Sequence, residues 1–92
     1  METYRETIID YISQHRYYYR IAYRKVGLFE YEWDILVRRS EDEHDFLGLT
    51  FGWEKTLFPK KAMTDILIGY AEWKDEENLK LGVNLDLYRA LN

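Results

Sequence analysis

The first apolar pattern in the chain has a helical period. Between Thr3 and His15 the apolar residues are spaced by four, three and one positions, which places them on one side of a helix. They are Tyr4, Ile8, Tyr11 and Ile12. Thr3 and Glu6 also fit a capping box, in which each side chain satisfies an amide at the start of the helix. The sequence therefore predicts an N-terminal helix over 3–15.

The period then changes to two, which predicts a pair of strands. Residues 17–24 place Tyr17, Tyr19, Ile21 and Tyr23 on one face, and residues 30–38 do the same with Tyr31, Trp33, Ile35 and Val37. We expect a three-residue turn at 26–28. That turn would place Arg24 opposite Glu30 and Arg20 opposite Asp34, as opposite-charge pairs across the two strands.

Three further elements are expected in the second half of the chain. Residues 46–54 predict a third strand, whose inward side chains are Leu47, Leu49, Phe51 and Trp53. Pro59 suits the first turn of a second helix, which we expect to finish near Lys74, because the acidic residues 75–77 oppose its dipole. Strict alternation over 79–87 predicts a fourth strand, paired within the chain or with another subunit.

This order of elements predicts the fold class. We expect a single α+β domain over residues 1–92, a two-layer sandwich of order α-β-β-β-α-β. Its sheet is an antiparallel meander, and both helices cover one of its faces.

Composition supports a folded domain and excludes several classes. Of the 92 residues 47% are hydrophobic and 17% aromatic, more than a disordered chain carries. The absence of cysteine excludes disulfides and thiolate sites. The longest apolar stretch, 66–71, is far shorter than the ~20 residues that cross a bilayer. We expect a cytoplasmic protein without a membrane partner, of a bacterial or phage type.

The charge is distributed unevenly. Residues 1–27 carry net +2, residues 28–59 carry −5, and residues 60–92 carry −1. Such an acidic band can steer a basic partner. Part of it is the loop Glu41, Asp42, Glu43, His44 and Asp45, whose oxygen and nitrogen donors suggest a metal or small-ligand site as an alternative. The loop lacks the spacing of a calcium loop, so we expect no metal and no cofactor.

No catalytic motif is evident. The chain has no Gly-rich phosphate loop, nucleophile elbow or His-x-x-x-His pair. His15 fits a cation at the end of the predicted first helix. We therefore expect a protein that is not an enzyme.

An Arg- and Tyr-rich first strand raises a nucleic-acid alternative. Aromatic side chains stack on bases while cations neutralise phosphates. The candidate contacts are Arg16, Arg20, Arg24 and Lys25. The isoelectric point near 5.1 has the wrong sign for a phosphate-binding surface, so this reading ranks second.

The preferred hypothesis is a small acidic protein-binding module of the inhibitor, immunity or adaptor type. Several large side chains fall outside the predicted inward pattern and, with the acidic loop, would form the binding surface. The candidates are Tyr18, Phe29, Leu36, Glu41, Asp42, Glu43, Asp45, Phe46, Trp73 and Tyr88. A homodimer is expected if the sheet face or the fourth strand is shared between copies.

Overall fold

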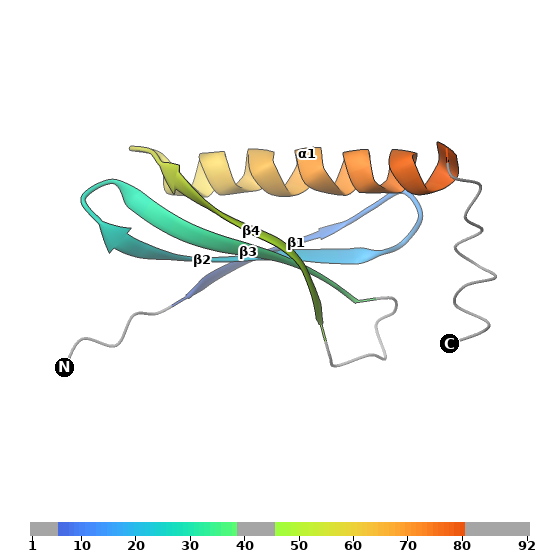
Figure 1. Ribbon diagram of the computed structural model, residues 1–92, viewed down its shortest axis with the longest axis horizontal. Helices are drawn as coiled ribbons and strands as arrows, with labels where there is room; N and C mark the ends of the chain where they lie inside the picture. Colours follow the sequence, from blue (N-terminus) through green and yellow to red (C-terminus); the bar gives the residue numbers. More distant parts are fainter. Residues whose placement is uncertain (1–5, 39–45, 81–92) are drawn as a thin grey trace.

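In the part of the chain that the structure describes, four antiparallel strands and one helix make up the fold (Figure 1). A computed structural model describes residues 6–38 and 46–80. The elements are β1 (Thr7–Ile12), β2 (Tyr18–Gly27), β3 (Glu30–Arg38), β4 (Leu47–Lys55) and α1 (Pro59–Lys80). The sheet has the order β1-β2-β3-β4, so each strand pairs with its neighbour in the chain. The α+β arrangement and the antiparallel meander agree with the sequence.

The predicted N-terminal helix is wrong, because residues 7–12 form the edge strand β1. This stretch is rich in β-branched and aromatic residues, which favour a strand. Ile9 pairs with Ile21 and Tyr11 with Tyr19, so both contribute to the face that carries the core. The apolar residues with helical spacing lie on both faces of β1: Tyr11 points toward the core, whereas Ile8 and Ile12 point away from it.

The order α-β-β-β-α-β is also wrong at the C-terminal end. The helix does not finish near Lys74 but continues to Lys80, so Leu79 and Lys80 are helical rather than the start of a strand. The dipole penalty of residues 75–77 is small, and Glu and Lys are strong helix formers. Asp75 is moreover buried by contact with the sheet rather than left in solvent. The rest of the predicted fourth strand lies outside the described residues.

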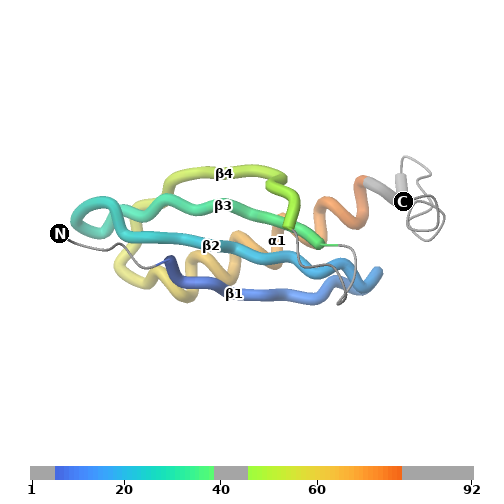
Figure 2. Tube along the Cα trace, turned by 90° about the horizontal axis from the view of Figure 1, so that it is seen from below, coloured from blue at the N-terminus to red at the C-terminus, as the bar shows by residue number. Residues whose placement is uncertain are grey.

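The core lies between α1 and one face of the sheet. The helix, not the expected pair of helices, covers this face by packing chiefly over β2, with further contacts to β1 and β3 (Figure 2). Side chains of α1 and of the two central strands are completely buried there: Ile21, Ile35, Met63, Leu67 and Ala71. We call this the inner face and the opposite one the outer face.

The half of β4 from Thr50 onward shows its faces in the opposite sense to the one predicted, whereas Leu47 pairs with Val37 of the inner face and Leu49 packs against the core, as predicted. Phe51 and Trp53 point to the outer face, and Gly52 lies opposite Trp33 on the inner face. A Cβ at position 52 would lie 2.7 Å from Cε2 of Trp33 and closer still to Cζ2. Gly52 therefore admits the Trp33 ring, which fills the space that a β4 side chain would occupy. The sense changes at a β-bulge opposite Ile35 and Leu36, where Leu49 is the extra residue of β4.

The hairpin between β2 and β3 also differs from the prediction. Its turn holds Leu28 and Phe29 and follows a register shift between Lys25 and Gly27. Phe29 has a left-handed backbone with φ of 60°. Because of the shift, the expected pairs of Arg24 with Glu30 and of Arg20 with Asp34 are wrong. Arg24 faces Glu32, Arg20 faces Leu36, and Asp34 faces Ala22.

Candidate binding face of the sheet

The outer face carries large apolar side chains that nothing in the described chain covers. Phe51 is 80% exposed and Trp53 is 55% exposed, both on edge strand β4. On the opposite edge, Ile8 and Ile12 of β1 are also exposed. Single exposed apolar residues are ordinary, but four on one face of one sheet form the kind of surface that binds a partner.

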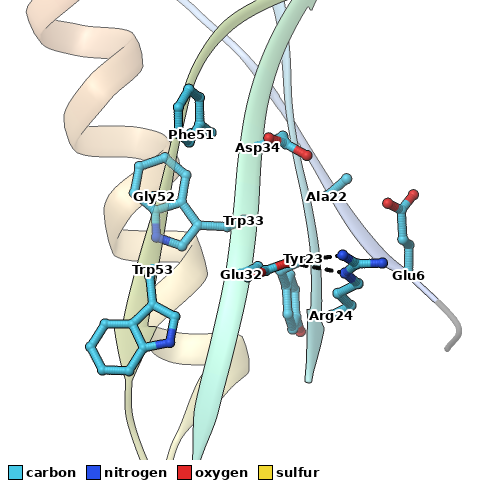
Figure 3. A pocket seen from close by; sticks show the side chains of 10 residues that line it. All are labelled: Glu6, Ala22, Tyr23, Arg24, Glu32, Trp33, Asp34, Phe51, Gly52 and Trp53. Carbon is cyan, nitrogen blue, oxygen red and sulfur yellow. Dashed lines mark hydrogen bonds and ion pairs between the residues drawn. The ribbon is translucent and has the colours of Figure 1, made fainter. Parts of the chain in front are cut away.

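A groove of about 530 Å³ crosses the outer face between the two edges (Figure 3). We call it the outer groove. Phe51 and Trp53 supply its aromatic side from β4, and Ala22 of β2 leaves room at its centre because its side chain is short. The charged groups that line it are Glu6, Arg24, Glu32 and Asp34. The groove thus combines exposed rings with three carboxylates and one guanidinium.

The charges in the outer groove are only partly compensated. Arg24 donates from Nη2 to Oε2 of Glu32 over 2.9 Å and from Nε over 3.2 Å. This hydrogen bond, followed by the attraction of the carboxylate, raises the pKa of Arg24 above its usual value. Asp34 lies between Ala22 and Phe51, and within residues 6–38 and 46–80 its side chain makes no hydrogen bond or ion pair, although its charge adds to the rise in the pKa of Arg24. The groove lining keeps a net charge of −2, with Asp34 open to a cation.

The other half of the outer face is closed by its own side chains. Arg20 donates to Asp10 across β1 and β2, with Nε and Oδ1 2.7 Å apart. Its guanidinium carbon also lies 4.2 Å from the centre of the Phe46 ring. Arg38 stands over Tyr18 at 5.0 Å and over Phe46 at 5.3 Å. These cation–π contacts engage the rings of Tyr18 and Phe46, which the sequence predicted to be free to bind a partner.

The predicted protein-binding residues are therefore only partly brought together. Tyr18, Leu36 and Phe46 share the closed half of the outer face, where all three are half-buried. Phe29 lies at the far end of the β2–β3 hairpin, and Trp73 is exposed on α1 next to Tyr70. Residues outside the described chain are Glu41, Asp42, Glu43, Asp45 and Tyr88.

The four nucleic-acid candidates do not form one basic surface. Arg20 and Arg24 are each held by a carboxylate. Arg16 lies in the turn between β1 and β2, whereas Lys25 lies at the opposite end of β2. A phosphate-binding stripe would need these cations side by side and uncompensated.

Phe51, Trp53 and Asp34 were missed as site residues because alternation assigned both rings of β4 to the core. The glycines of β4 carried a signal for which of its side chains point inward. Gly48 does lie on the outer face, opposite Leu36, but an outward Gly52 would leave an inward side chain against the Trp33 ring, whereas an inward Gly52 gives that ring space. The parity of β4 from Thr50 onward thus depends on the pair of Gly52 with Trp33 and on the bulge at Leu49.

The inner face holds a buried polar contact of a different kind. The Tyr19 hydroxyl donates to Oδ1 of Asp75 over 2.9 Å, and both residues are buried. Burial, followed by this hydrogen bond, raises the pKa of Tyr19 well above its usual value. Beside the pair lies a hollow of about 350 Å³ lined by residues that include His15, Glu72 and Glu76. The contact joins α1 to β2 and is structural.

The outer groove can bind a cationic or flat apolar group, because exposed rings and carboxylates line it. Among residues 6–38 and 46–80, no three His, Asp or Glu side chains are grouped as metal ligands. Within the same residues, no helix has the length and apolar content to cross a bilayer. No protein-family model, curated protein or solved structure matches this chain.

Proposed function

We propose that this protein is a non-enzymatic binding module that holds a segment of another protein on the outer face of its sheet, in the outer groove. The observation that carries the proposal is the exposure of Phe51 and Trp53 on a sheet face that no helix within residues 6–38 and 46–80 covers. Large, stiff aromatic side chains are frequent anchors of protein interfaces.

The charges of the groove specify the partner segment further. Asp34 lies next to Phe51, and Glu32 lies next to Trp53, so each exposed ring stands beside a carboxylate. A Lys or Arg side chain placed here gains both a charged hydrogen bond and a cation–π contact. A partner segment with at least one cationic side chain therefore fits best.

Photo-crosslinking tests whether the outer groove is occupied. Phe51 is replaced by a photoreactive phenylalanine analogue in the chain expressed in its native host, and Glu72, exposed on α1, carries the same analogue as the control. We expect a defined protein adduct from position 51 that is lost with W53S and is absent from position 72. Equal adducts at both positions, or none at position 51, would refute the proposal.

Charge substitutions then test the role of Asp34. With the crosslinked partner purified, D34N is expected to weaken binding about tenfold, because a charged hydrogen bond contributes roughly 1.5–3 kcal/mol. D65N removes an equally exposed carboxylate from α1 and serves as the matched control. Equal affinities of D34N and the unsubstituted chain would show that the rings act without the charge.

A second copy of the chain as partner is the homodimer form of the same proposal. Light scattering at micromolar concentration measures it directly. If the outer faces pair, the dimer mass should fall to that of a monomer in F51S/W53S. A monomeric mass for the unsubstituted chain rejects the homodimer and leaves a different protein as partner.

A further inference from the structure

One end of the molecule gathers exposed apolar side chains from two loops that are far apart in the sequence. The β2–β3 turn and the β4–α1 connection lie side by side there, at the left of the views in Figures 1 and 2. The Thr56 amide donates to the carbonyl of Phe29 over 2.8 Å and joins the two loops. We call residues 25–30 and 55–61 the apolar tip. Its exposed apolar side chains are Val26, Leu28, Phe29, Leu57 and Phe58.

The exposure at the apolar tip is large. Leu28 is 73% exposed and Phe58 is 70% exposed, although each side chain would gain by burial. Phe29 keeps a left-handed backbone, a conformation that costs a bulky residue energy and that Gly or Asn would adopt more readily. The turn thus holds an apolar ring where a small polar residue would be more stable.

The apolar tip is basic, although the whole chain carries −4. It contains four lysines and one carboxylate, Glu30, which gives it a net charge of +3. Lys25, Lys55, Lys60 and Lys61 are all exposed around the apolar side chains. Glu54 and Asp65 adjoin the tip and reduce its net charge without reversing its sign. The surface complements a negatively charged one.

The residue types distinguish this surface from a protein interface. Protein interfaces are enriched in Tyr, Trp and Arg and depleted in Lys, as on the outer face with Trp53, Arg20 and Arg24. The apolar tip has Leu, Phe, Val and Lys and contains no Tyr, Trp or Arg. A second copy is disfavoured as occupant, because two tips in contact would bring eight lysines together. Apolar side chains that enter an acyl layer while lysines remain at the headgroups are typical of peripheral membrane contact.

We propose that the apolar tip docks on an anionic lipid bilayer, with Leu28, Leu57 and Phe58 entering the headgroup–acyl boundary and the four lysines contacting acidic headgroups. Neither loop spans the membrane, so this proposal differs from the expectation of no membrane partner, which considered spanning segments alone. The proposal is independent of the outer groove, which stays accessible at the side of the docked molecule.

Vesicle flotation tests the docking with the full chain. We expect binding to phosphatidylcholine vesicles with about one-third phosphatidylserine, and a marked loss on vesicles of phosphatidylcholine alone. L57S/F58S should weaken binding at least about tenfold by removing buried apolar area. K60Q/K61Q should weaken it about 25-fold, since each lysine near an anionic surface contributes roughly a fivefold factor. Circular dichroism confirms that the variants, changed at exposed positions, remain folded.

F51S/W53S is the matched control, with two exposed aromatic residues changed on the outer face. It should bind the vesicles as well as the unsubstituted chain does. No binding to the anionic vesicles at millimolar lipid overturns the proposal, and retention on a poly-glutamate column in that case would assign the tip to an acidic protein. An equal loss in F51S/W53S and in L57S/F58S also overturns it, because the tip would not be the docking surface.

Discussion

The two faces of the sheet are built from the same four strands but differ in what covers them. On the inner face, Tyr19, Ile21 and Ile35 are closed off by the helix. On the outer face, Phe51 and Trp53 are left in solvent, and Arg20 and Arg24 are each paired with a carboxylate. An alternating strand needs one cover to fold, and a second cover is required only by function. Stability and binding should therefore depend on different residues.

The largest difference in stability between the two faces is expected at Leu67, which is completely buried on α1 against the inner face. L67A should lower the free energy of unfolding by about 2–5 kcal/mol, because it removes buried methyl groups and leaves a cavity. F51A removes a larger side chain from the outer face and should change stability by less than about 0.5 kcal/mol. Urea unfolding measures both. A similar loss in the two variants would mean that the outer face is buried in solution.

Glycines of β4 sharpen the comparison within one strand. G52A places a methyl group against the Trp33 ring and should destabilise the fold by about 1–3 kcal/mol, the usual cost of overpacking. Gly48, whose Cβ would meet no atom within 4 Å, is the control. G48A should be neutral or slightly stabilising, since alanine restricts the unfolded chain. Thermal unfolding decides this, and equal effects would contradict the close contact of Gly52 with Trp33.

Loss of the buried contact of Tyr19 with Asp75 is expected to have the next largest effect on the free energy of unfolding. Y19F keeps the ring but leaves the Asp75 carboxylate buried without its donor, which should cost about 1–3 kcal/mol in urea unfolding. D75N, which keeps an acceptor oxygen for the hydroxyl, should cost less. An unchanged free energy of unfolding in Y19F would show that water replaces the hydroxyl.

Alkaline pH tests the same contact through its ionisation. Because the folded pKa of Tyr19 is raised above the unfolded value near 10, its contribution is complete below pH ~10 and is lost as the pH rises further. The other tyrosines also titrate, so the comparison is with Y19F. The stability of Y19F should fall less steeply above pH ~10, and parallel curves would contradict the raised pKa.

The smallest expected effect belongs to the outer face. A double-mutant cycle with D10N and R20Q should give a coupling of about 0.2–1 kcal/mol, because the pair is largely exposed to solvent. The coupling should shrink at ~1 M salt, where the Debye length is about 3 Å. A coupling above that range that resists salt would indicate that the Phe46 ring shields the pair.

The sequence predicted the central strands and the inward set on β2 and β3, because strict alternation of large apolar residues has one physical solution. It failed at residues 7–12, where apolar side chains on both faces of β1 imitate a helical period. It failed on β4 from Thr50 onward, because the bulge at Leu49 and the contact of Gly52 with Trp33 on the neighbouring strand reverse the parity there. The error hid the outer groove, since Phe51 and Trp53 had been assigned to the core.

The meander order has a consequence for how the chain folds. Each strand pairs with its neighbour in the chain, so the sheet is assembled from short loops. The contact of Tyr19 with Asp75 joins residues 56 positions apart, and such long-range contacts are formed after a large loss of chain entropy. We expect the β2–β3 hairpin to form early and α1 to dock late. Kinetic φ-values should then be higher for I35V than for L67A, and the reverse order would place the helix in the nucleus.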